Sequence, residues 1–163
     1  MGEKFRPAPE NNVAPDNKGA SADFDRAAEK QRRQEIRKIL VDSLSTVLRD
    51  AGFIKRGSTW QRQAGDSWQI VYLQRSQFSH QYYLEVGICS NADIPQGGKP
   101  DIVFCRPRDR FAEVDFEAPG ADRQAEDYYH PSVSVEEAAT KIATVAQTVQ
   151  EYVPAWLDKN SGK

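Results

Sequence analysis

The chain has 163 residues, and its 22 basic and 24 acidic side chains give a net charge of -2. This length suits one domain with a hydrophobic core and is short for two, and the near-neutral balance excludes strong overall attraction to nucleic acid. We expect a disordered tail over residues 1–20, rich in Pro, Gly and Asn, and a single domain over residues 21–163. No apolar run could span a bilayer and the first residues lack a signal-peptide core, so we expect a cytoplasmic protein without membrane contact.

The apolar pattern predicts a first long helix that begins after Ser21 or Asp23, either of which can cap its first turn. Apolar residues then recur at three- and four-residue steps until Gly52 supplies a left-handed stop. The N-terminal part of this helix is almost wholly polar. We interpret it as a solvated extension held by local pairs such as Glu29 with Arg33.

Beyond the helix the apolar period changes to two, which predicts a run of short strands. We expect strands over residues 59–63, 68–76 and 81–89, with a hairpin turn over 64–67, and a short fourth strand over 102–105. The connections between the first three are too short for parallel crossovers, so the sheet should be an antiparallel meander.

The last third of the chain is harder to interpret until a second long helix begins. Residues 106–131 are highly charged, and a helical turn over 108–114 is the expectation for their first part. Ser134 and Glu137 have the spacing of a capping box, and the helix that follows should kink or end at Pro154. The predicted fold is α+β, with both helices on one face of a four- or five-stranded antiparallel sheet.

Residue types that carry chemistry are sparse. Cys89 and Cys105 are too few for a disulfide framework, and we interpret them as small buried residues, with a bridge between them as the less favoured alternative. His80 and His130 lack metal-ligand spacing, and no nucleophile motif or phosphate-binding glycine loop occurs. We therefore expect no metal, no cofactor and no catalytic residue; a small hydrolase or transferase is the least favoured alternative.

Three aromatic residues, Trp60, Trp68 and Tyr72, alternate with basic residues on neighbouring predicted strands. This combination is typical of single-stranded nucleic-acid binding. Aromatic residues in such positions more often pack beneath a helix while basic stems cover their edges, and we favour that placement. The candidate binding surface consists of five basic residues: Lys55, Arg56, Arg62, Arg75 and Arg110.

Four segments carry a family resemblance: the helix end Leu48–Phe53, the turn Lys55–Trp60, the strand Val71–Ser76 with its Gln74, and the strand Leu84–Ile88. In sequence they resemble a bacterial family, the domain of unknown function numbered 4304. The similarity extends over roughly residues 36–115 and rests on short, mostly structural residues. The resemblance implies a bacterial cytosolic α+β domain and implies no known activity.

The absence of a recognisable catalytic constellation favours a non-catalytic protein-binding module, of an accessory or immunity type, whose partner is another protein. The alternative is a single-stranded nucleic-acid-binding module that uses a basic and aromatic sheet surface. Charge is unevenly distributed, with a basic excess between Arg49 and Arg75 and an acidic excess between Asp101 and Asp127. The folded molecule is therefore expected to have one basic and one acidic face.

Overall fold

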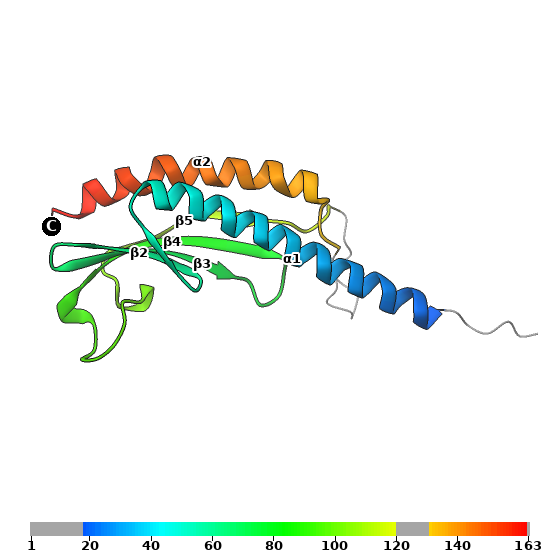
Figure 1. Ribbon diagram of the computed structural model, residues 1–163, viewed down its shortest axis with the longest axis horizontal. Helices are drawn as coiled ribbons and strands as arrows, with labels where there is room; N and C mark the ends of the chain where they lie inside the picture. Colours follow the sequence, from blue (N-terminus) through cyan, green and yellow to red (C-terminus); the bar gives the residue numbers. More distant parts are fainter. Residues whose placement is uncertain (1–17, 120–130, 163) are drawn as a thin grey trace, which may run out of the picture.

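The computed structural model describes residues 18–119 and 131–162, which form a five-stranded antiparallel sheet covered by two long helices (Figure 1). The strands lie side by side in chain order, so every connection is a simple return. The α+β prediction is confirmed. The helices and strands are α1 (Lys18–Asp50), β1 (Ile54–Arg56), β2 (Thr59–Ala64), β3 (Ser67–Arg75), β4 (Gln81–Ser90), β5 (Arg108–Asp115) and α2 (Val135–Asn160), with short 3-10 turns η1 (Asn91–Asp93) and η2 (Ile102–Phe104).

Both helices pack on the same face of the sheet, and α1 extends beyond the sheet at its N-terminal end (Figure 1). The apolar stripe of α1, which begins at Ile36 and Leu40, is completely buried, and so are Leu84 and Val86 of β4 to within 1%. Burying each such side chain contributes about 1.5–3 kcal/mol. The matching stripe of α2 consists of Ala138, Ile142, Val145, Val149, Val153 and Leu157.

The other face of the sheet is covered by the segment between β4 and β5, which includes η2. A second, smaller core forms there around Ile70, Cys89, Ile102 and Cys105. Gly87 of β4 allows the close approach, because a Cβ at that position would lie 2.6 Å from the Cβ of Cys105. The centre of β3 is therefore buried on both faces, with Ile70 and Val71 each 0% exposed.

Two sequence predictions between β4 and α2 are wrong. Residues 102–104 form a 3-10 turn instead of a strand, because the Asp101 side chain accepts a hydrogen bond from Val103 N at 3.1 Å and caps the turn. Residues 108–115 form the edge strand β5 instead of a helical turn. Pairing with β4 holds this strand in place. Its sequence has too many charged residues to show the alternation of apolar residues that predicts a strand.

The ends of α1 follow the predicted chemistry with one shift. Gly52 has a φ of +85°, and Phe53 N donates to Leu48 O at 2.9 Å, so the left-handed stop is confirmed. The helix begins at Lys18, before the predicted caps Ser21 and Asp23. The rest of the predicted tail, residues 1–17, lies outside the described part of the chain.

The start of α2 is also confirmed, because Ser134 Oγ accepts from Glu137 N at 3.1 Å. The prediction that the helix kinks or ends at Pro154 is wrong with respect to its end, since the helix continues to Asn160. A proline removes one backbone donor from the helix. Packing of Val153 and Leu157, each 1% exposed, holds the helix on both sides of that gap.

Candidate functional site

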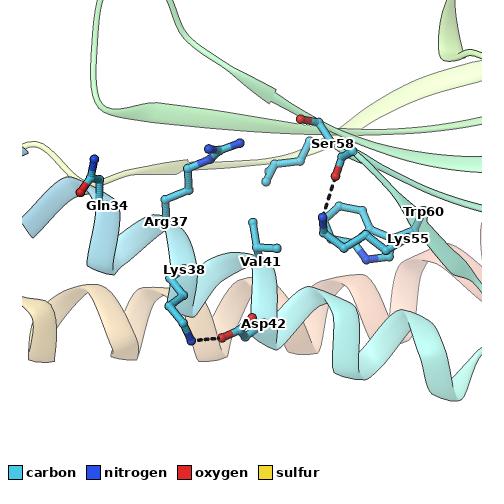
Figure 2. A pocket seen from close by; sticks show the side chains of 10 residues that line it. Gln34, Arg37, Lys38, Val41, Asp42, Lys55, Ser58 and Trp60 are labelled. Atoms are coloured by element: carbon cyan, nitrogen blue, oxygen red, sulfur yellow. Dashed lines mark hydrogen bonds and ion pairs between the residues drawn. The ribbon is translucent and has the colours of Figure 1, made fainter. Parts of the chain in front are cut away.

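A cavity of about 320 Å³ lies between α1 and the strands β1 to β3 (Figure 2). Its apolar lining comes from Val41 on the helix and from Trp60 and Leu73 on the strands. Figure 2 shows Arg37 reaching from α1 toward the sheet, while Lys38 turns toward Asp42. The complete lining is Gln34, Arg37, Lys38, Val41, Asp42, Lys55, Gly57, Ser58, Trp60 and Leu73.

Trp60 forms a fixed part of this cavity. Its side chain is only 1% exposed, and its indole Nε1 donates to Ser45 Oγ on α1 at 3.1 Å. Trp68 and Tyr72 pack instead against the smaller core on the opposite face of the sheet. The predicted placement beneath a helix is confirmed for Trp60 and is wrong for Trp68 and Tyr72, which are half-buried on the face that the helices do not cover.

Neighbouring cavities continue along the same side of α1 in both directions. Toward the N-terminus lies a cavity of about 500 Å³, here called the arginine cavity, which shares Gln34 and Arg37 with the first. A cavity of about 320 Å³ at the β3–β4 turn adjoins it through Arg33 and Arg75. Toward the C-terminus a cavity of about 350 Å³ shares Lys55 and Trp60. We call these four cavities together the α1 groove. The arginine cavity is lined by Arg26, Lys30, Arg33, Gln34, Arg37, Arg75 and Tyr82.

The α1 groove is strongly basic. Among its described lining residues there are two carboxylates, Asp42 and Glu117, and Asp42 is already paired with Lys38 at 2.7 Å. Because the whole chain carries a net charge of -2, this positive potential is local to the groove. The eight basic lining residues are Arg26, Lys30, Arg33, Arg37, Lys38, Arg49, Lys55 and Arg75.

Three of these cations, Arg26, Lys30 and Arg33, come from the polar part of α1 that we expected to be a solvated extension. Arg26, Lys30, Arg33 and Arg37 are separated by four, three and four residues, a spacing that places them on one helical face. That spacing was the signal that could have identified them. The helical spacing could not indicate that Arg75, at the end of β3, lines the same cavity from the opposite side.

A buried polar network anchors this part of α1. Glu29 is 5% exposed, and its carboxylate accepts hydrogen bonds from Ser132 N at 2.9 Å, Ser132 Oγ at 2.5 Å and Arg33 Nε at 3.1 Å. Burial raises the pKa of Glu29, but these hydrogen bonds outweigh it and hold the pKa below its ordinary value. The predicted pair of Glu29 with Arg33 is confirmed, and it is part of the core instead of a solvated surface.

His80 completes the network, because its Nδ1 lies 2.7 Å from Ser132 Oγ. The ring is fully buried, and its Nε2 has no hydrogen-bond partner among the described residues. Burial lowers the pKa of His80 to about 4, and the positive charges of Arg33 and Arg75 act in the same direction. The imidazole is therefore neutral near pH 7.

Serine, histidine and glutamate thus meet here without forming a catalytic triad. In a triad the carboxylate orients the imidazole, whereas Glu29 accepts from the serine hydroxyl. Ser132 is also 4% exposed and His80 is fully buried, so the hydroxyl lacks an open approach for a substrate. The network is a structural connection between α1, the β3–β4 turn and the start of α2.

Two of the five predicted binding residues line the α1 groove. Lys55 donates from Nζ to Gly57 O at 2.8 Å at the rim of the first cavity. Arg75, at the end of β3, lines the arginine cavity from the side opposite α1. Arg56 is exposed on β1 and is not part of the groove lining.

The other two predicted residues are engaged in local structure. Arg62 donates from Nε to Gln69 Oε1 at 2.6 Å, also bonds to the carbonyl of Ala51, and lies 4.7 Å from the centre of the Phe53 ring. These contacts fix the end of α1 on the sheet.

Arg110 on β5 is likewise held by neighbouring side chains on the sheet. It donates to Glu85 Oε1 at 2.9 Å and to Gln74 Oε1 at 3.0 Å, and it lies 4.6 Å from the centre of the Tyr83 ring. The structure therefore does not bring the five predicted residues together as one surface.

The two cysteines are free and fully buried in the smaller core. Burial raises the pKa of both the Cys89 and Cys105 thiols, so neither is an activated thiolate. In the part of the chain that the structure describes, no three His, Cys, Asp or Glu side chains are grouped so that they could hold a metal ion. No described helix has the length and apolar character needed to cross a membrane.

Comparison with known proteins places most of the chain in one family. The family model described as "Domain of unknown function (DUF4304)" matches residues 44–159, in agreement with the resemblance noted from the sequence. No curated protein and no solved structure matches the chain. Arg75 lies inside the matched region, whereas the basic residues of α1 between Arg26 and Arg37 precede it.

Proposed function

The chain belongs to the DUF4304 family, and we propose that this protein is a non-catalytic binding module that accepts an acidic segment of another protein along the α1 groove. The observation that carries this proposal is the charge of the groove, where eight basic residues face two acidic ones on a molecule of net charge -2. An acidic segment would be attracted to this side of the molecule, because the cations that line the groove outnumber its carboxylates.

Apolar features of the groove favour a protein partner. Val41 and Leu73 contribute apolar lining at its centre, and Phe78 is 78% exposed at its end beside Arg33 and Arg75. Aromatic and arginine side chains are enriched where protein partners bind most strongly. A segment with alternating carboxylate and apolar side chains would complement both the rim and the lining.

Single-stranded nucleic acid is the competing occupant, because it too would be attracted to the cations. Such binding relies on aromatic rings that are open for base stacking, worth about 1–3 kcal/mol per base. Among the described aromatic residues that line the groove, Phe53, Trp60 and Tyr82 are at most 3% exposed, so Phe78 at one end is the single ring open for stacking. We therefore favour the protein partner, and we include in the proposal the bacterial, cytoplasmic setting expected from the sequence.

Fluorescence anisotropy can test this proposal with two labelled probes of equal charge: a peptide of alternating Glu and Leu residues and a single-stranded oligonucleotide. We expect the peptide to bind more tightly at physiological salt, and more weakly as salt rises. Reversing two groove charges, Arg37→Glu with Lys55→Glu, should weaken peptide binding about tenfold or more, or ~1.4 kcal/mol.

The matched control is Lys99→Glu with Arg108→Glu. It changes the net charge by the same amount at two exposed residues that are not part of the groove lining. Peptide affinity in this control should stay within about twofold of the parent. Equal losses in both double variants, tighter binding of the oligonucleotide, or no binding of the peptide would each count against the proposal.

A further inference from the structure

We propose that the arginine cavity is a subsite for a phosphoryl group, carried as phosphoserine or phosphothreonine on the acidic partner segment, an inference that rests on the proposed function. The cavity has a volume of about 500 Å³ and lies at the N-terminal part of the α1 groove. Its cations come from two elements that face each other, α1 and the end of β3.

Guanidinium groups share the arginine cavity with one phenol, that of Tyr82. Burial raises the pKa of the Tyr82 hydroxyl, and Arg75, Arg37 and Arg33 all act in the opposite direction through their positive charge. Arg33 and Arg37 line the same cavity as Tyr82 from α1, and Arg75 lines it from the end of β3. An anion placed beside the Tyr82 hydroxyl would therefore meet charge from both walls.

Two cations of the cavity, Arg37 and Arg75, have no counter-ion among the described residues. The described lining of the cavity contains no carboxylate. Glu29 pairs with Arg33 from below, whereas Arg37 and Arg75 form no ion pair with any described residue. Like charges that face each other without a counter-ion repel, and binding of an anion removes that repulsion.

Tyr82 also offers a hydrogen-bond donor that has no acceptor among the described residues. The residue is 2% exposed and lines the cavity, yet its hydroxyl has no hydrogen-bond partner among the described residues. Because burial keeps the phenol protonated, its O–H can donate to an anionic oxygen.

The donor set fits a phosphoryl group better than a carboxylate. A carboxylate has one negative charge and two oxygens, which one arginine can satisfy through a bidentate pair. A phosphoryl ester carries a charge of about -1.5 to -2 near pH 7 and three strong acceptor oxygens. Two or three guanidinium groups and a phenol O–H provide the number of donors that such a group requires.

The test uses the full chain and labelled acidic peptides in two series. Both series have the same parent sequence; one carries serine at each position in turn, and the other carries phosphoserine at the same positions. At the best position we expect the phosphopeptide to bind about tenfold more tightly than its serine form, because charge-assisted hydrogen bonds are the strong ones. Inorganic phosphate should compete with the phosphopeptide and should shift the NMR signal of Arg75 Nε.

Arg75→Gln should weaken both peptides, because Arg75 is one of the groove cations, and it should reduce the ratio of phosphoserine to serine affinity from about tenfold to about twofold or less. Lys55→Gln, at the other cavity, is the control and should weaken both peptides alike. An unchanged unfolding midpoint in both variants excludes a general loss of fold.

The possible failures are distinguishable. Equal binding of serine and phosphoserine peptides at every position overturns the phosphoryl subsite and leaves the proposed function standing. Binding of neither series overturns the proposed function itself. If the phosphoserine peptide still binds more tightly than the serine peptide by the same factor in Arg75→Gln, the phosphoryl group binds elsewhere and this assignment is overturned. A 5′-phosphorylated oligonucleotide that binds more tightly than any phosphopeptide would replace the protein partner with nucleic acid.

Discussion

Glu29 and Ser132 are 103 positions apart in the chain, and the buried carboxylate of Glu29 accepts hydrogen bonds from both the Oγ and the N of Ser132. This contact joins the polar part of α1 to the residues that lead into α2. Arg33 bonds to the same carboxylate from one turn further along the helix. The orientation of α1 over the arginine cavity therefore depends on a charged group in the core.

Replacing Glu29 with alanine should destabilise the fold by about 3 kcal/mol, because Ser132 and Arg33 lose their shared acceptor in a buried site. Urea denaturation measures the change. Glu35→Ala is the matched control on an exposed position of the same helix and should change stability by less than about 0.5 kcal/mol. If both variants unfold alike, the network does not hold the helix.

His80 should make the fold less stable in mild acid. Its pKa is about 4 in the folded state and near 6.5 when the chain is unfolded, so between these values the unfolded state binds a proton that the folded state does not. Stability contributed by the neutral ring is therefore complete above pH 6.5 and falls by roughly 3 kcal/mol as the pH drops to 4.

Unfolding midpoints measured at pH 7 and at pH 4.5 test this expectation, with His80→Gln as the comparison. The variant should lose most of the difference between the two pH values. Glu29 should add little to this difference in stability. Its pKa is lowered from 4.5 in the folded state, so the stability that its carboxylate contributes is lost only at more acidic pH. A parent protein whose stability is the same at both pH values would contradict the buried, neutral state of His80.

Val149→Asp should destabilise the fold by at least about 4 kcal/mol, because Val149 is fully buried on the apolar stripe of α2 and an aspartate there would have no cation to pair with. The comparison is Gln150→Asp, which places the same residue type on the exposed side of the same helix. Thermal unfolding of the two variants separates burial from the effect of a negative charge in α2. Similar unfolding midpoints would show that the stripe is not in the core.

Local patterns in the sequence were sufficient for most of the fold. Strands β2, β3 and β4 were predicted to within a residue because a period of two persists along each of them. The stop at Gly52 and the cap at Ser134 followed from backbone chemistry that acts within a few residues. Strand β5 was missed because an edge strand with alternating charges owes its structure to pairing with β4.

The residues of the groove could likewise be predicted only in part from the sequence. Lys55 and Arg75 were chosen from the sequence as basic residues near aromatic ones, and both line the α1 groove. Arg62 belonged to the same sequence pattern, yet it is engaged by Ala51, Gln69 and Phe53. Sequence composition cannot show which basic side chains are bonded to neighbouring residues, because tertiary packing determines which residues become neighbours.

By itself, the sequence determined the fold class, the two apolar helix stripes and the meander, because periodicity and capping are local properties of the chain. Only the tertiary structure decided that Glu29 lies in the core and that the basic face of α1 meets Arg75 across a cavity. Those relationships join residues that are dozens of positions apart. The physical reason is that a cavity and a buried charge exist only where separate elements pack against each other, so neither leaves a periodic trace in any one of them.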